Sequence, residues 1–257
     1  MKQFQLAALL LLATLSACNK DDQAQPNPNN PTPQQTTKKL AGYTYQGVDI
    51  NPLVIKYDAK GRVVHQSDGE DIVDVSYTAN QVHIVSKRTS VNSAVYNFTG
   101  KLNAQGFVTE GSAVSAFNGI PRNVTYTFEY DATGYLKRVI SNYNAGEFVY
   151  DYRYTYKNGD MASFEVYVNN VYDYGGAWEY DLNTEDRSGL SWQHLNVGNT
   201  FTGKPNKHLA TKYTGFRDGK VSWYVDYVYT FDAEGYPVSG ALAFSSGNAY
   251  TVFYKYQ

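Results

Sequence analysis

The sequence contains one cysteine, Cys18, among its 257 residues. A chain with a single cysteine cannot close an internal disulfide, so a hydrophobic core has to supply the stability of the fold. There is also no excess of positive charge, because 22 Lys and Arg stand against 24 Asp and Glu. Proteins that bind nucleic acid usually carry a basic stripe, and the net charge of -2 therefore argues against a nucleic-acid partner.

Motifs for metal binding and catalysis are missing as well. The sequence has four histidines, which are His65, His83, His194 and His208. None of them belongs to a His-x-x-x-His or cysteine-rich zinc pattern, and no Gly-x-Ser-x-Gly motif or phosphate-binding glycine loop occurs. The densest acidic cluster, Asp68–Asp71 with Asp74, lacks the spacing of a calcium loop, so we interpret it as a charged hairpin tip. We expect no metal and no cofactor.

Only one long hydrophobic run is present, and it covers residues 4–15, after the positive charge of Lys2. The run is too short to span a bilayer and is typical of a secretory signal. It ends in Leu15-Ser16-Ala17-Cys18, which resembles the lipobox of bacterial lipoproteins. The resemblance implies a lipoprotein signal peptide over residues 1–17, cleavage before Cys18 and lipidation of that cysteine. The alternative is an ordinary secretory signal with an incidental cysteine.

Residues 18–39 contain Pro, Asn, Gln and Thr with almost no apolar side chains. Such a composition cannot bury a core, so we predict a disordered tether between the lipid and the folded domain. Lys20-Asp21-Asp22 resembles the export signal of some Gram-negative lipoproteins that reach the outer face of the outer membrane. We therefore expect a lipid anchor in the outer membrane with the domain at the cell surface, or alternatively on the periplasmic face.

What the sequence does contain is aromatic residues: 25 Tyr, 12 Phe and 3 Trp. They alternate with polar residues, as in 148–156, where every second residue is Phe or Tyr and Asp151, Arg153 and Thr155 lie between them. The ranges 123–130 and 223–231 show the same period of two. Successive side chains of a strand point to opposite faces, so this pattern predicts strands with one buried face.

A short formula separates these strands. In Tyr130-Asp131-Ala132-Thr133-Gly134, the aspartate can open a type I turn and the glycine can close it in the left-handed conformation. The formula recurs from Tyr57, Leu102 and Phe231, and no amphipathic helix is evident. The sequence predicts one all-β domain over residues 40–257. It would be an antiparallel β-meander of many hairpins, curled into a closed or half-open, water-soluble barrel-like sheet with its aromatic residues inside.

The formula loosely resembles the Tyr-Asp repeats of large bacterial shell proteins. The lipobox, the polar tether, the Tyr-rich meander and the segment Gly203–Leu209 together resemble uncharacterised Gram-negative lipoproteins of the Bacteroidetes type. Those proteins form a family with a domain of unknown function and a porin-like fold. The resemblance implies the fold and no activity. A membrane-spanning barrel is not expected here, because Tyr along whole strands would place unpaired hydroxyls at the bilayer midplane.

The alternation breaks over residues 182–213, and long loops in compact domains are often functional. The candidate ligand-binding residues in and beside this segment are Trp178, Trp192, His194, Phe201 and His208. An indole beside polar groups suits the stacking of a sugar ring. The same segment can instead plug the mouth of the curled sheet, with Trp192 as its apolar anchor.

We therefore predict a non-enzymatic outer-membrane lipoprotein with a binding or scaffolding β-domain. Its partners would be the membrane, through the lipid anchor, and a glycan or a protein of the envelope. One alternative is a carbohydrate-active enzyme that uses paired carboxylates near residues 182–213. The acids available for it are Glu147, Glu165, Glu179, Glu185 and Asp186. Another alternative is a carrier of an apolar ligand inside the curled sheet.

Overall fold

The structure is a computed structural model, and it describes residues 12–13, 38–46, 51–89, 93–117, 120–188, 190–191 and 201–257. Cys18 and most of the predicted tether lie outside the described residues, so their lipidation and disorder stay predictions. Among the described residues, no helix has the length and apolar character needed to cross a membrane.

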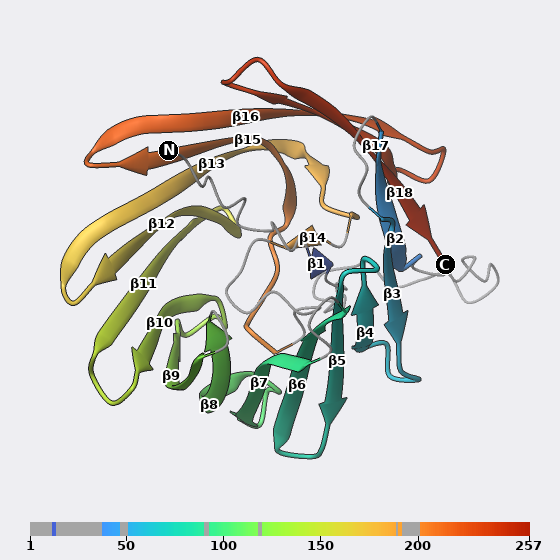
Figure 1. The fold of residues 1–257 in the computed structure, drawn as a ribbon. Coiled ribbons are helices and arrows are strands. Elements are labelled where there is room, and N and C mark those ends of the chain that lie inside the picture. Colours follow the sequence, from blue (N-terminus) through green and yellow to red (C-terminus); the bar gives the residue numbers. More distant parts are fainter. Residues whose placement is uncertain are drawn as a thin grey trace.

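Sixteen strands of the described chain form a closed antiparallel barrel, in which each strand pairs with its neighbours in the sequence (Figure 1). The barrel strands are β2 (Leu40–Gln46), β3 (Leu53–Tyr57), β4 (Val63–Ser67), β5 (Asp71–Tyr77), β6 (Gln81–Arg88), β7 (Ser93–Leu102), β8 (Val108–Phe117), β9 (Ile120–Tyr130), β10 (Leu136–Tyr143), β11 (Phe148–Lys157), β12 (Asp160–Val168), β13 (Val171–Glu185), β15 (His208–Arg217), β16 (Lys220–Phe231), β17 (Pro237–Phe244) and β18 (Ala249–Tyr256). The predicted all-β meander is confirmed.

The ring closes where the last strand meets the first. β18 pairs with β2 in antiparallel register, with Val252 opposite Tyr45. The amide of Lys39 donates to the carbonyl of Gln257 at 2.9 Å, and the amide of Gln257 donates back to Lys39 at 2.8 Å. Of the two forms that the sequence left open, the structure is the closed one.

A separate pairing joins β1 (Leu12–Ala13) to β14 (Leu190–Ser191) and is not part of the barrel. β1 falls within residues 1–17, the predicted signal peptide. The mature protein would therefore lack this pairing.

The repeated formula forms the predicted hairpin turns. Asp131 Oδ1 accepts hydrogen bonds from the amides of Thr133 at 2.8 Å and Tyr135 at 3.0 Å, and Gly134 has φ 95°. The turns that open at Asp58, Asn103 and Asp232 repeat these bonds. In a meander, successive turns alternate between the two ends of the barrel. The four formula turns are separated from one another by even numbers of connections, so all four lie at the same end. We call it the formula end.

Tyrosine precedes two of the four formula turns, those at Asp58 and Asp131, and it has a defined role there. Tyr57 and Tyr130 point into the barrel, and their hydroxyls donate to the main-chain carbonyls of Leu40 and Val108, both at 2.7 Å. Tyr77 does the same toward Val63 at 3.1 Å. A buried hydroxyl has to be hydrogen-bonded, so these contacts let the rings enter the core at little cost. The formula thus ties neighbouring parts of the formula end together.

Inward and outward faces alternate along the strands as predicted. On β11, Tyr152 and Tyr154 pack with the core, whereas Arg153 and Thr155 on the same strand are exposed. The buried residues form two clusters, one around Phe98 and Tyr126 and the other around Tyr227, Leu242 and the strands that close the ring. The lumen is lined with aromatic and aliphatic side chains that pack against one another.

We expect Tyr130→Phe to lower the free energy of unfolding by about 1 kcal/mol, because the carbonyl of Val108 loses its buried donor while the ring remains. Tyr224→Phe serves as the control, since Tyr224 is 38% exposed. Urea denaturation of the purified domain measures both changes. Equal effects of the two substitutions would contradict a specific role for the formula tyrosine.

Candidate functional site

The formula end is covered by residues Phe201–Lys207, which we call the closing segment. The carbonyl of Phe201 accepts from Val108 at 2.8 Å, and the amide of Lys204 donates to Gly134 at 3.0 Å. Asn206 Oδ1 accepts from the amide of Met161 at 2.8 Å, and its Nδ2 donates to the hydroxyl of Tyr180 at 3.0 Å. The segment is thereby bonded to three hairpins and one strand at this end. These contacts agree with a plug in the barrel mouth. Among the described residues of this segment, Phe201 is the aromatic side chain that is buried in the core.

The predicted ligand-binding residues do not form one exposed surface. Phe201 is 1% exposed and Trp178 is 9% exposed, and both belong to the core around Phe98. The Trp178 ring lies 4.8 Å from Tyr213 and 5.5 Å from Phe164. Trp192 and His194 lie outside the described residues. A sugar cannot stack on Trp178 or Phe201 from outside, because neighbouring side chains already cover their rings.

His208, the remaining predicted residue, is held by a buried carboxylate. Asp160 is 1% exposed, and its Oδ2 lies 2.7 Å from Nδ1 of His208. The other oxygen, Oδ1, accepts from the amides of Lys207 at 2.8 Å and His208 at 2.9 Å. This pair fastens the start of β15 to the β11–β12 turn. The dipeptide Asn158-Gly159 is typical of a tight hairpin turn, but nothing in the sequence indicates that the next carboxylate binds a histidine 48 positions away.

A small interior cavity of about 30 Å³ lies beside this cluster. Its walls include Asp186, His208, Tyr229 and Tyr254. Since a water molecule needs about 10–15 Å³ by the same measure, the cavity has room for one or two waters and no larger ligand. Desolvation raises the pKa of the Asp186 carboxyl to about 7, although hydrogen bonds from Ser188 act in the opposite direction.

The raised pKa has a consequence for stability. A carboxyl with a folded pKa of about 7 and an unfolded value of 3.8 binds more protons in the folded state between these limits. The contribution of Asp186 to the free energy of unfolding of the domain is therefore largest near pH 4, and it is lost as the pH rises through 7. We expect Asp186→Asn to remove this decline and to stabilise the domain by about 1–3 kcal/mol at pH 8.

Urea denaturation between pH 4 and pH 8 measures this dependence. Glu185→Gln is the matched control, because the neighbouring Glu185 side chain is 61% exposed and forms an ion pair with Arg187. An Asp186→Asn protein with the same pH profile as the parent would show that the carboxyl is not desolvated.

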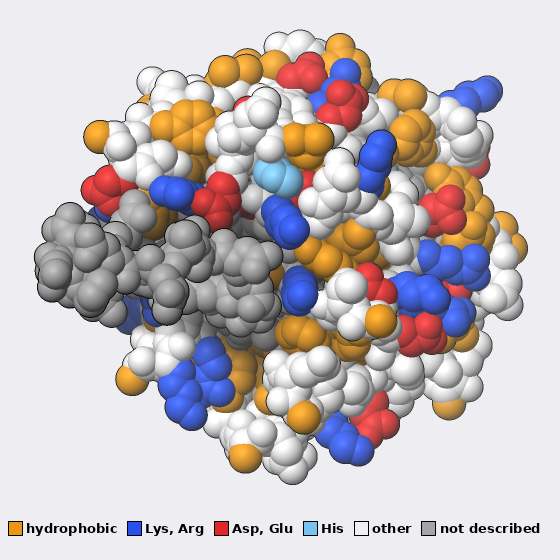
Figure 2. Space-filling view, turned by 180° about the vertical axis from the view of Figure 1, so that it is seen from behind, with side chains coloured by type: hydrophobic (Ala, Val, Ile, Leu, Met, Phe, Trp, Pro, Cys, Tyr) orange, Lys and Arg blue, Asp and Glu red, His pale blue; other side chains and the backbone are white. Residues whose placement is uncertain are grey.

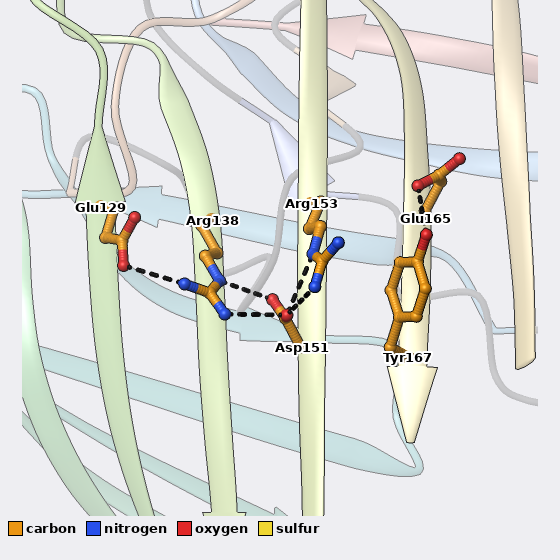
Figure 3. Close-up of polar contacts among 6 residues, drawn as sticks. All are labelled: Glu129, Arg138, Asp151, Arg153, Glu165 and Tyr167. Atoms are coloured by element: carbon orange, nitrogen blue, oxygen red, sulfur yellow. Dashed lines mark hydrogen bonds and ion pairs between the residues drawn. The ribbon is translucent and has the colours of Figure 1, made fainter. Parts of the chain in front are cut away.

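The outer wall carries a row of charged side chains across adjacent strands, as Figure 3 shows. Arg138 on β10 donates to both oxygens of Asp151 on β11, at 2.7 and 2.9 Å. Arg153 donates twice to Oδ2 of the same carboxylate, at 3.0 and 2.8 Å. Hydrogen bonds from Arg138, and then from Arg153, hold the pKa of Asp151 below its usual range. Glu129 extends the row through Arg138 at 3.5 Å.

This row contributes to stability through one buried charge. The Asp151 side chain is 5% exposed beneath two guanidinium groups, so Asp151→Asn leaves both of them without their carboxylate. We expect the free energy of unfolding to fall by about 1–3 kcal/mol. Glu129→Gln removes an exposed contact in the same row and should cost less than about 0.5 kcal/mol. Thermal or urea unfolding at pH 7 separates the two, and a larger loss from Glu129→Gln would contradict this assignment.

The acidic residues considered for catalysis or calcium are separated or already paired. Asp68 Oδ1 accepts from the amides of Glu70 and Asp71, and Asp71 pairs with Arg88 at 2.9 Å, as in a charged hairpin tip. Within the described part of the chain, no three His, Cys, Asp or Glu residues are close enough to hold a metal ion.

The acids proposed for an enzyme lie in different environments. Glu147 accepts from Asn144 in the β10–β11 turn, and Glu185 pairs with Arg187 near the formula end. Glu165 lies on the outer wall, where it accepts from the hydroxyl of Tyr167 at 2.9 Å. Only Asp186 lines the interior cavity. These acids do not come together in one cleft.

The outer wall also contains an open depression of about 410 Å³ near the end opposite to the formula end. Its lining comes from β12, β13, β15 and the β15–β16 turn: Ser163, Phe164, Glu165, Tyr172, Gly175, Gly176, Phe216 and Gly219. Sequence analysis singled out only Glu165 among these residues. The depression depends on strand register, which brings positions 165, 175 and 216 side by side.

Residues 55–239 match the family described as "Domain of unknown function (DUF4595) with porin-like fold". The chain belongs to this family. The predicted resemblance is thereby confirmed, and the family description assigns no activity. No curated protein matches the chain.

Solved structures support the fold of this family member. A porin-like protein from Bacteroides uniformis is 16% identical, with a TM-score of 0.62, and the match covers 85% of this chain and 98% of that one. A porin-like protein from Bacteroides vulgatus is 14% identical, with a TM-score of 0.63 and the same coverage. At this level of identity the similarity establishes the shared barrel and nothing about ligands.

Proposed function

We propose that this family member is an outer-membrane lipoprotein, anchored through Cys18, whose barrel is a non-enzymatic binding or scaffolding domain. The observation that supports this is the distribution of side chains across the barrel wall. Aromatic rings fill the inward face, and the Arg138–Asp151–Arg153 row lies on the outward face. A membrane-spanning barrel has the opposite arrangement, with an apolar outer band and a polar lumen. We infer that the outer wall faces water.

The surface composition agrees with this inference. In the face shown in Figure 2, hydrophobic side chains form separated groups among neutral, acidic and basic ones. Two exposed apolar residues on the outward face, Val54 and Phe253, have polar neighbours across the strands: Ser67 lies opposite Val54, and Thr44 and Ser239 lie opposite Phe253. Isolated apolar residues of this kind are normal on water-exposed surfaces.

The position of the chain entry supports an orientation for the anchored domain. Lys39 pairs with Gln257 at the formula end, and Lys38 Nζ lies 2.8 Å from Asp232 of a formula turn. A tether over residues 18–39 would therefore leave the barrel at the formula end. That end would face the membrane, and the opposite end, with the β12–β13 and β15–β16 turns, would face outward.

The interior gives less support to the alternatives. The cavity beside Asp186 is too small for an apolar ligand, so the barrel is better suited to presenting its outer surface than to carrying a lipid. The acids of the proposed carbohydrate-active enzyme are spread over the outer wall, one turn and the interior. Neither alternative has an observation that favours it over a binding domain.

Three measurements test the proposal: detergent-free solubility, release by trypsin and fatty-acid labelling. First, residues 19–257, which lack the cysteine, should be soluble, monodisperse and rich in β-structure without detergent. A requirement for detergent would overturn the water-facing outer wall. Second, trypsin added to intact cells should cut the lysine-containing tether and release a folded barrel into the medium. A Cys18→Ser protein should lose both fatty-acid labelling and membrane retention.

If the barrel is acylated but protected from trypsin until the outer membrane is opened, the domain faces the periplasm and the surface assignment is wrong. Unchanged fatty-acid labelling after Cys18→Ser would overturn the anchor itself.

A further inference from the structure

We propose that the open depression on the outer wall binds a sugar ring of a neutral oligosaccharide. This assignment rests on the proposed binding role and names its site and ligand class. Its centre is Gly175 on β13, which lies between Glu165 on β12 and Phe216 on β15. All three positions are on the outward face, because Phe164 and Trp178 on the same strands pack into the core.

Glycine at position 175 keeps the depression open. A Cβ atom there would lie 2.7 Å from the carbonyl oxygen of Phe164 and 3.2 Å from the hydroxyl of Tyr172. Contacts this short do not occur between real side chains and a main-chain oxygen, so any side chain would force the strands or Tyr172 to move. Gly175 is itself buried, so glycine is required here by the close packing of Phe164 and Tyr172 at the base of the depression.

Three aromatic residues line the depression; Phe164 packs against the core, whereas Tyr172 and Phe216 do not belong to the core clusters. Each is half-buried, so part of the ring stays open to solvent. Tyr172 is held by an edge contact with Tyr167, with ring centroids 5.8 Å apart and planes at 80°. Arg153 in turn lies 4.2 Å over the Tyr167 ring, which links the depression to the charged row of Figure 3. The aromatic surface is therefore held by its neighbours before a ligand binds.

Polar groups border these rings. Glu165 is exposed, and its Oε2 accepts the Tyr167 hydroxyl at 2.9 Å, which leaves acceptor capacity on the carboxylate. Ser163, two residues from Glu165 on the same strand, adds a hydroxyl, and its Oγ lies 2.7 Å from Oγ1 of Thr155. A pyranose ring has a C–H face that packs on an aromatic ring and hydroxyls around its edge that donate to acceptors. The depression offers both kinds of contact side by side.

The size and the position agree with this ligand. About 410 Å³ falls within the roughly 300–1,000 Å³ of small-molecule sites, enough for one or two sugar rings. The lining includes Gly219 of the β15–β16 turn, at the end away from Lys39 and the predicted tether. A long polysaccharide could therefore reach the site on an anchored protein without passing the membrane.

A charged amine is the competing ligand, because a carboxylate beside aromatic rings also attracts cations. The described residues favour the neutral sugar. The Arg153 guanidinium, which lies over the Tyr167 ring, would repel a second cation near Glu165. The open shape also leaves room for several hydroxyls, whereas cation sites of this type usually enclose the charge between rings.

The test uses the detergent-free protein of residues 19–257, labelled with ¹⁵N and titrated with cellotetraose, maltotetraose, xylotetraose and chitotetraose. We expect at least one sugar to shift the amide signals of residues 163–167, 172–176 and 216–219. Tyr172→Ala and Phe216→Ala should each weaken that binding at least tenfold, because each removes a stacking ring. Tyr172→Phe keeps the ring and should retain binding within about threefold.

Phe253→Ala is the matched control, since Phe253 is an outward aromatic side chain, 45% exposed, on a different strand. It should leave the affinity unchanged. Glu165→Gln keeps the acceptor oxygen and should preserve sugar binding, whereas it would abolish the binding of a cation. Titration with tetramethylammonium tests that competitor directly.

The proposal is overturned if none of the four sugars shifts these amides, if the shifts map elsewhere, or if tetramethylammonium binds here and the sugars do not. Each of these results concerns the soluble barrel alone. The anchor and the surface position are tested separately by acylation and by trypsin release, so either proposal can fail while the other stands.

Discussion

The barrel depends on one requirement: its many phenol rings must be buried while their hydroxyls stay hydrogen-bonded. At the formula end Tyr57, Tyr77, Tyr130 and Tyr180 meet it by donating to main-chain carbonyls, whereas the buried hydroxyl of Tyr256 has no hydrogen-bond partner. An amphipathic ring placed in this way contributes a large apolar area without leaving an unpaired polar atom. At Tyr57-Asp58 and Tyr130-Asp131, the formula therefore builds the turn through its aspartate and adds its tyrosine to the core.

A filled aromatic interior determines what the outer wall can do. Charged residues that cannot enter the lumen lie outside and pair across strands, and Asp151 is satisfied there by two arginines. The lumen near the formula end is covered by the closing segment, in which the Phe201 ring is part of the core. This barrel therefore has the porin-like fold of its family but an interior packed as a core. The proposed binding would have to take place on the outer surface.

The two ends of the barrel differ in a way that suits an anchored domain. The formula end joins the chain termini of the barrel and holds the Asp160–His208 pair, so it is rich in fixed contacts. The opposite end carries the β12–β13 and β15–β16 turns and lies near the depression around Gly175. The proposed tether would leave the barrel at the formula end, and the open aromatic surface lies near the other end, as a tethered binding domain requires.

Sequence alone was sufficient for the strands, the turns and the family, because these follow from period-two alternation and from local bonds such as Asp131 to Thr133. Closure of the ring, burial of Trp178, and the pairing of Asp160 with His208 came only from the tertiary structure. The same holds for the Gly175 depression. These features join residues from separate strands, and strand register, which no local pattern encodes, decides which of them meet.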